Sequence, residues 1–215
     1  MKILILCLGL LISVSLSAQN PERFGKEVQE LIAADSSINR TDIILFTGSS
    51  SIRLWKDIAS SFPEHNVLNR GFGGSEMSDL VYFSDKLILP YKPQKIFIYE
   101  GDNDLNAGKS VDQILLSADS LLTIIRKNLP PEIPVIFISP KPSVARWGMK
   151  DKYVSFNTEL KAWTRKHENV EFADVWTPMV DRQGNVRTDL FVEDRLHMNK
   201  TGYEIWARVL RKYLR

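Results

Sequence analysis

Three short runs of uninterrupted apolar residues constrain this chain more than any other feature. They read IILF, IFIY and VIFI, and they lie in residues 42–47, 95–100 and 134–139. A strand that is apolar on both faces must be covered on both faces, as in a parallel sheet between two layers of helices. Weaker strand patterns at residues 66–69 and 170–175 bring the number of predicted strands to five.

Segments with helical periodicity separate these strands. The strongest spans residues 110–127, where Ser110 and Gln113 form a capping-box pattern before apolar side chains spaced three and four apart. Weaker helical patterns cover residues 21–34, 51–60, 75–86, 153–166 and 203–214. Strands that alternate with helices predict a three-layer α/β/α sandwich around a five-stranded parallel sheet. In such folds ligands bind beyond the carboxyl ends of the strands, so the loops that follow each strand are where chemistry is expected.

The first eighteen residues have the pattern of a secretory signal peptide. Lys2 precedes an apolar run at residues 3–14, and small residues follow before position 19. The run is too short to span a membrane, and no later segment reaches the roughly 20 apolar residues that a span needs. The one cysteine, Cys7, lies in this segment. We therefore expect residues 19–215 to form a single domain without disulfides.

Charge and composition exclude several classes of partner. The chain has 215 residues, 44% of them hydrophobic, and 28 Lys and Arg against 26 Asp and Glu give a net charge of +2. This is too little positive charge to hold a nucleic acid or an anionic membrane surface. No heptad pattern indicates a coiled-coil oligomer, and the oligomeric state cannot be predicted.

Two of the predicted loops contain candidate functional residues. Residues 48–51 read Gly-Ser-Ser-Ser between the first strand and a helix, where the positive helix end favours negative charge beside a hydroxyl. A serine that only caps the helix is the commoner explanation of such a turn. Residues 69–74 hold three glycines, which would let backbone N–H groups approach a ligand closely, although a plain turn is the commoner explanation of such a segment.

Two later loops add an amide and an imidazole. After the third strand, Asn103 could donate a hydrogen bond to an oxyanion; an Asx turn or a cation-binding loop are the alternatives there. Near the chain end, Asp194 and His197 are three residues apart, so the carboxylate could orient the ring as a general base. The other two histidines, His65 and His167, lie in polar stretches, and we expect them to be surface residues.

In order and in loop position, these four segments resemble the Ser, Gly, Asn and His blocks of the SGNH (GDSL-like) hydrolases. The resemblance covers roughly residues 42–203. It is strongest to the compact branch that includes the catalytic subunits of platelet-activating factor acetylhydrolase and many secreted bacterial carbohydrate esterases. It implies a flavodoxin-like sheet and ester hydrolysis without a metal or another cofactor.

The resemblance also implies a role for each matching residue. Ser50 corresponds to the nucleophile, and Asp194 and His197 correspond to the rest of the catalytic triad. The oxyanion hole would consist of the N–H groups of Ser50 and Gly74 and the side chain of Asn103.

Two positions depart from the family pattern. Ser49 stands where the family usually has an Asp, and Met198 stands where it usually has a Pro. Neither replaced residue performs the chemistry in the family. The Asp, however, normally helps to fix the turn that carries the nucleophile.

The expected substrate follows from the export pattern and the short loops. A periplasmic or secreted enzyme with a small, open site suits small acyl groups on a hydrophilic carrier, so a carbohydrate O-acetyl esterase is the leading hypothesis. A lysophospholipase or thioesterase that cleaves longer acyl chains is one alternative, and a non-catalytic carbohydrate-binding relative is another. Arg146 and Trp147, in the loop after the fourth strand, could bind a sugar, although a surface-packed Trp is an equal explanation. Arg53, Arg70 and Arg195 lie beside the motifs; they could contact an anionic substrate, but solvated charges are the commoner explanation and the one we expect.

Overall fold

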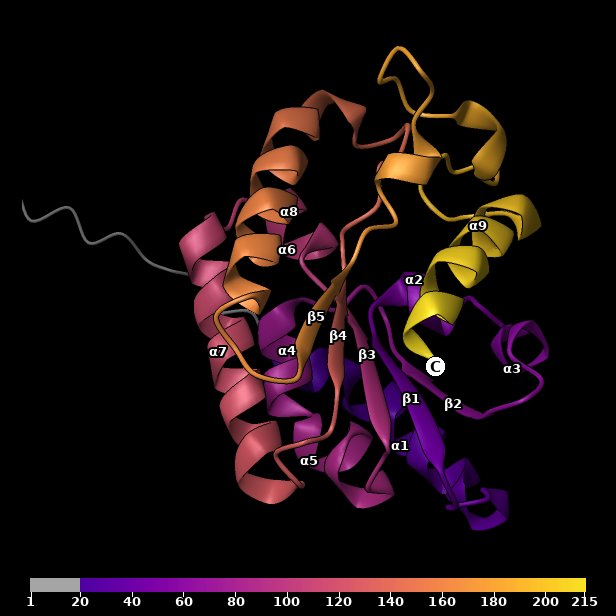
Figure 1. Cartoon of the computed structure of the whole chain (residues 1–215), viewed down its shortest axis with the longest axis vertical. Coiled ribbons are helices and arrows are strands. Elements are labelled where there is room, and N and C mark those ends of the chain that lie inside the picture. Colours follow the sequence, from indigo (N-terminus) through magenta and orange to yellow (C-terminus); the bar gives the residue numbers. More distant parts are fainter. Residues whose placement is uncertain (1–19) are drawn as a thin grey trace, which may run out of the picture.

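A computed structural model describes residues 20–215 and contains a five-stranded parallel sheet (Figure 1). The strand order is β2-β1-β3-β4-β5, which is the flavodoxin-like order. The strands are β1 (Ile43–Gly48), β2 (Asn66–Gly71), β3 (Lys95–Tyr99), β4 (Val135–Ile138) and β5 (Val170–Ala173). The predicted sheet is therefore confirmed. The predicted signal peptide, residues 1–18, lies outside the described residues.

Alternate residues of the strands divide the interior into two cores. Ile43 and Leu45 of β1 pack into the first core, and Ile44 and Phe46 pack into the second. The helices that cover the first core are α1 (Gly25–Ala33), α4 (Met77–Tyr82), α5 (Ser84–Leu87), α7 (Val111–Asn128) and α8 (Lys150–Thr164). Those that cover the second are α2 (Ser50–Arg53), α3 (Ile58–Ser61) and α9 (Lys200–Leu210). In Figure 1, α4, α5, α7 and α8 lie on one side of the sheet and α2, α3 and α9 lie on the other, as the three-layer prediction requires.

Two of the predicted helices are divided. The expected helix at residues 51–60 is replaced by α2 and α3, because the Asn69 side chain binds one carbonyl group near the end of α2 and one just beyond it. Its Nδ2 donates to the carbonyl oxygens of Ile52 (2.7 Å) and Trp55 (3.3 Å). The expected helix at residues 75–86 is likewise divided into α4 and α5.

The segment after β3 contains a helix that the sequence did not predict. Gly101 has φ 103° and precedes α6 (Asp102–Asn106), so Asn103 lies on a helix rather than in an Asx turn. The following helix, α7, begins as predicted: Gln113 N donates to Ser110 Oγ at 3.2 Å, and the capping box is complete.

Short 3₁₀ helices connect the remaining elements: Pro21–Phe24, Ala34–Ser37, Leu89–Tyr91, Trp147–Met149, Thr177–Met179, Thr188–Leu190 and Arg211–Tyr213. Within residues 20–215, no helix has both the length and the apolar character needed to cross a membrane.

Candidate active site

The turn after β1 presents a single serine. Gly48 has φ 121°, and a Cβ at this position would lie 2.1 Å from the carbonyl oxygen of Tyr99 on the neighbouring strand, so only glycine is accommodated. The N–H of Ser49 donates to the same carbonyl at 3.0 Å. Ser49 and Ser51 are buried, whereas Ser50 is half-buried and begins α2. As the first helical residue, Ser50 has no carbonyl one turn earlier to accept its N–H.

Ser50, His197 and Asp194 form a continuous chain of hydrogen bonds, although Ser50 and His197 are separated by 147 positions. Ser50 Oγ lies 2.9 Å from His197 Nε2, and His197 Nδ1 lies 2.5 Å from Asp194 Oδ2. The other carboxylate oxygen of Asp194 accepts the backbone N–H groups of Leu196 and His197, both at 2.8 Å. Burial acts to raise the pKa of Asp194, but these bonds outweigh it and lower the pKa to about 2. Asp194 is therefore a carboxylate at neutral pH.

The turn that carries the imidazole is closed by its own backbone. Val192 N donates to His197 O at 2.9 Å, and Arg195, with φ 58°, donates to Val192 O at 2.9 Å. From α9, the hydroxyl of Tyr203 donates to Ser51 O at 3.0 Å. This bond connects the helix that follows His197 to the helix that begins at Ser50. It therefore braces the nucleophile turn in a chain without the family's usual Asp at position 49.

The glycine loop and Asn103 lie next to each other, at the same edge of the parallel sheet as Ser50. A Cβ at Gly74 would lie 3.7 Å from Asn103 Nδ2, so the two predicted oxyanion donors are neighbours. Asn103 Nδ2 donates one hydrogen to Ser75 O at 2.9 Å, which leaves its second hydrogen for a ligand. The backbone N–H of the preceding residue, Gly73, donates to both carboxylate oxygens of Glu27, at 2.9 and 3.0 Å, and is therefore not available to a ligand.

Glu27 is a positioning residue that sequence reasoning missed. It lies on α1, and it contacts the glycine loop at Gly73 and the nucleophile helix at Arg53, whose Nε is 3.5 Å from Glu27 Oε1. The same segment packs Phe24 edge-on against Phe72, with ring centroids 5.3 Å apart. Nothing in the local pattern around residue 27 distinguishes it from a solvated helix position, so only the fold could reveal it.

The alternation of carboxylates at residues 100–104, which raised the possibility of a cation site, has another explanation. Asp102 pairs with Lys141 (3.2 Å) and Arg146 (2.5 Å), and Asp104 pairs with Lys109 (3.1 Å). Basic side chains of the protein therefore occupy the positions that a bound cation would take at these carboxylates. In the described part of the chain, no group of three or more His, Cys, Asp or Glu residues is arranged to hold a metal ion.

Glu100 is a fully buried carboxyl group behind the glycine loop. Its Oε1 accepts the hydroxyl of Ser75 at 2.6 Å. Burial and the nearby negative charge of Asp104 raise the pKa of Glu100 well above its ordinary value, against the opposing effect of the Ser75 hydrogen bond.

The two residues predicted to contact a sugar have partners within the protein. The Arg146 side chain is 13% exposed, and its guanidinium binds Asp102 and Asn103. Trp147 is half-buried and stacks on Trp176, with ring centroids 6.0 Å apart and 18° between the planes. The Arg146 hydrogen bonds are therefore directed at the protein rather than at solvent, and only part of the Trp147 ring is accessible.

The other arginines and histidines near the motifs differ in their surroundings. Arg70 is buried and bonded to Asp35 and Tyr91, so it is not the solvated charge that was expected. Arg195 is exposed, as expected. His167 lies three residues beyond the end of α8, and its ring centroid is 4.4 Å from that of Trp163.

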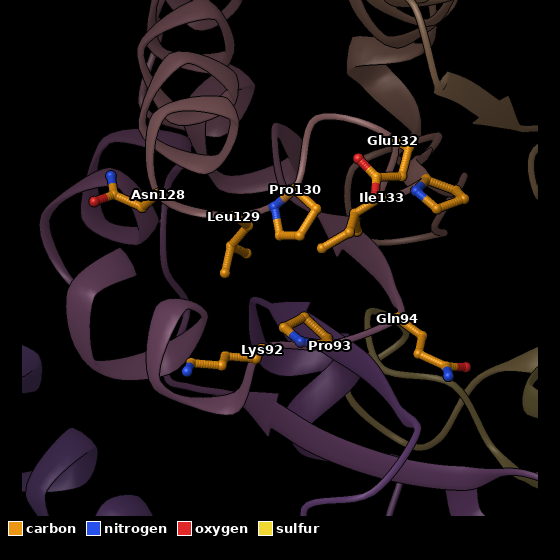
Figure 2. A pocket seen from close by; sticks show the side chains of 9 residues that line it. Lys92, Pro93, Gln94, Asn128, Leu129, Pro130, Glu132 and Ile133 are labelled. Atoms are coloured by element: carbon orange, nitrogen blue, oxygen red, sulfur yellow. The ribbon is translucent and has the colours of Figure 1, made fainter.

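A cleft of about 700 Å³ lies at the opposite end of the sheet (Figure 2). Its lining comes from residues 92–94 and from the segment 128–134, which precede β3 and β4. Ser50 follows the carboxyl end of β1, and all strands are parallel. The cleft and the triad are therefore separate features.

Residues 42–205 match the GDSL-like Lipase/Acylhydrolase family, and this match covers most of the chain. The chain belongs to this family of ester hydrolases. The resemblance to the SGNH hydrolases, predicted from four short motifs, is confirmed. Among curated proteins, no sequence matches the chain significantly.

Several solved structures share the fold of this chain. A Streptococcus pneumonia protein named for platelet activating factor is 20% identical, with a TM-score of 0.78 over 91% of this chain and 92% of the other. A GDSL-like lipase from Bacteroides thetaiotaomicron is 18% identical, with a TM-score of 0.72 over 91% and 97%. An acetylxylan esterase from Geobacillus stearothermophilus is 18% identical, with a TM-score of 0.64 over 81% and 94%. At these identities the likeness concerns the fold.

Proposed function

We propose that this protein is an exported serine esterase that removes acetyl groups from carbohydrate. The observation that carries the proposal is the chain of hydrogen bonds from Asp194 through His197 to Ser50, with distances of 2.5 and 2.9 Å. A carboxylate, an imidazole and a hydroxyl in this order form the arrangement that activates a serine nucleophile. The signal-peptide pattern of residues 1–18 supports export.

The proposed reaction has two steps. Ser50 Oγ attacks the ester carbonyl carbon while His197 Nε2 takes the hydroxyl proton, and Asp194 stabilises the charged ring. The tetrahedral intermediate then collapses, His197 gives the proton to the leaving alcohol, and the acyl group remains on Ser50. Water attacks this acyl-enzyme by the same route and releases the acid and the free serine.

Three donors are proposed to hold the negative oxygen of the intermediate. They are the N–H groups of Ser50 and Gly74 and the free hydrogen of Asn103 Nδ2. Gly74 and Asn103 are close enough to bind one atom, and Ser50 supplies the N–H at the start of α2. Loss of one such donor typically costs about 3 kcal/mol of transition-state stabilisation.

The preference for a small acyl group on a polar carrier rests on the exposure of the site. The side chains of Asp194 and His197 are 47% and 23% exposed, so a bulky hydrophilic substrate can reach them from solvent. Ser50 follows β1 after a single residue, and Asn103 lies four residues beyond β3, so neither comes from a long loop. The acetylxylan esterase of the same fold acts on this class of ester.

The proposal is tested by acetate release from a panel of acetylated polysaccharides. Ser50→Ala should lower turnover at least ~10³-fold, as removal of a triad member does in other enzymes. Ser117→Ala is the matched control, because Ser117 is on α7 and, within residues 20–215, its hydroxyl bonds only to Gln113 O. If Ser50→Ala keeps wild-type turnover, the proposed nucleophile is wrong.

A series of 4-nitrophenyl esters of increasing acyl length tests the substrate class. We expect kcat/KM to be highest for acetate and to fall with each added carbon pair. A maximum at eight or more carbons would instead favour a lysophospholipase or thioesterase. Absence of hydrolysis across the series and the polysaccharide panel would favour a non-catalytic carbohydrate-binding protein.

A further inference from the structure

A buried ionic network lies directly behind the proposed oxyanion hole, and Asp102 is at its centre. Its carboxylate accepts hydrogen bonds from Tyr99 (2.8 Å), Lys141 (3.2 Å), Arg146 (2.5 Å) and the hydroxyl of Tyr153. Burial acts to raise the pKa of Asp102, but Lys141 and Arg146 outweigh it and hold the pKa well below the ordinary value. One carboxylate thus faces two cations, and the cluster carries a net charge of +1.

Arg146 connects this cluster to Asn103. Its Nη1 contacts Asp102 at both the carboxylate (2.5 Å) and the backbone carbonyl (3.0 Å), and its Nη2 donates to Asn103 Oδ1 at 3.0 Å. A guanidinium has only donors, so the Asn103 atom that faces it must be the oxygen. The nitrogen is consequently turned toward Ser75 O and Gly74, where an oxyanion donor is needed.

We propose that Arg146 is a positioning residue of the oxyanion hole, which fixes the orientation of the Asn103 carboxamide and strengthens its N–H as a donor. The inference rests on the proposed function and deepens it. The positive charge at the amide oxygen draws electron density from the nitrogen, so a hydrogen of Nδ2 binds an anion more strongly. A donor held in place before the reaction needs no reorientation when the oxyanion forms.

The surroundings of Arg146 suit this role better than contact with substrate. Its side chain is 13% exposed, and both nitrogens of the fork are engaged by Asp102 and Asn103. The adjacent Ala145 donates its N–H to the carbonyl of Arg195 at 3.1 Å, in the turn between Asp194 and His197. The same loop therefore contacts the oxyanion donor and the triad turn.

The kinetic test is a double-mutant cycle of Arg146→Met and Asn103→Ala with 4-nitrophenyl acetate. We expect Arg146→Met to lower kcat about 10- to 100-fold with KM nearly unchanged, and Asn103→Ala to lower it about 10²- to 10³-fold. Because Arg146 is proposed to act through Asn103, the double variant should be no slower than Asn103→Ala alone. Independent, multiplying effects would overturn the inference, as would a rise in KM with kcat unchanged.

Two further variants separate positioning from folding and from overall charge. Arg146→Lys keeps the cation but lacks the planar fork that contacts Asp102 and Asn103 together, so its kcat should fall between wild type and Arg146→Met. Arg187→Met removes a partly exposed arginine from its pair with Asp189 (2.7 Å) and should leave kcat unchanged. Equal activity of Arg146→Lys and wild type would show that the fork is not needed.

A spectroscopic readout decides the inference even if the protein hydrolyses no ester. In a Ser50→Ala background, the side-chain amide resonances of Asn103 are assigned by their loss in Asn103→Ala. Replacement of Arg146 by Lys or Met should shift both amide protons, because the amide loses its partner at Oδ1. Unchanged resonances would refute the positioning role. A wild-type protein without esterase activity would refute only the proposed function.

Discussion

Replacing Asp194 with Asn should abolish most of the activity without disturbing the turn that carries His197. The unsubstituted oxygen can keep the N–H bonds of Leu196 and His197, both 2.8 Å long. The new amide nitrogen then faces His197 Nδ1 and donates to it, which leaves the ring proton on Nε2. Nε2 can no longer accept the proton of Ser50. In the opposite orientation, the NH₂ group of the new Asn side chain would face the N–H groups of Leu196 and His197, and both hydrogen bonds would be lost. Each lost bond costs about 1–3 kcal/mol, so this orientation is disfavoured.

The magnitude follows from this change of tautomer. The same substitution in a serine protease triad lowers kcat about 10⁴-fold, so we expect a loss of about 10³- to 10⁴-fold in kcat/KM for 4-nitrophenyl acetate at pH 7. At 1.36 kcal/mol per decade this is about 4–5.5 kcal/mol of transition-state stabilisation. Glu193→Gln is the matched control, because Glu193 is the exposed neighbouring acid. If Asp194→Asn retains more than a tenth of wild-type activity, the assigned role of the carboxylate is incorrect.

Two further predictions concern stability. Above about pH 4.3, the Glu100 carboxyl group keeps its proton in the folded protein but has lost it in the unfolded chain. The free energy of unfolding of the wild type should therefore fall with rising pH, relative to that of Glu100→Gln, by up to about 1.4 kcal/mol per pH unit until the pH exceeds the raised pKa. Urea unfolding of both proteins at a series of pH values measures this difference. An unfolding free energy that changes with pH in the same way in both proteins would contradict the prediction. Gly73→Ala should cost about 2–4 kcal/mol, because φ is 38° and its Cβ would lie 2.0 Å from the Phe24 ring. Gly108 also has a positive φ, 84°, but an added Cβ there would meet open space. Gly108→Ala should therefore lower the free energy of unfolding by only about 1–2 kcal/mol, and thermal unfolding of both variants measures the difference.

The sheet and the four motif positions were predictable because each leaves a local signal. The runs at β1, β3 and β4 are apolar at every position, since alternate side chains enter the two cores. Ser50 and His197 could be proposed as partners because parallel strands bring the following loops to one edge of the sheet.

Other features depend on contacts that no local pattern encodes. Residues 51–60 have helical spacing, yet the Asn69 side chain, from a later strand, binds the carbonyl groups of Ile52 and Trp55 and divides the helix. The sequence suggested Arg146 as a possible sugar contact because its loop follows a strand. The pattern around residue 146 could not show that its guanidinium binds Asp102, which lies 44 positions earlier.

The central claim is that Ser50 is the activated nucleophile, and covalent labelling tests it most directly. The protein is treated with a fluorophosphonate, digested, and the peptide that contains residues 49–51 is sequenced by tandem mass spectrometry. Our account predicts one adduct, located on Ser50, that disappears in Ser50→Ala and forms at least ~10³-fold more slowly in His197→Ala. An adduct on Ser49 or Ser51, or no adduct on the folded wild-type protein, would contradict it.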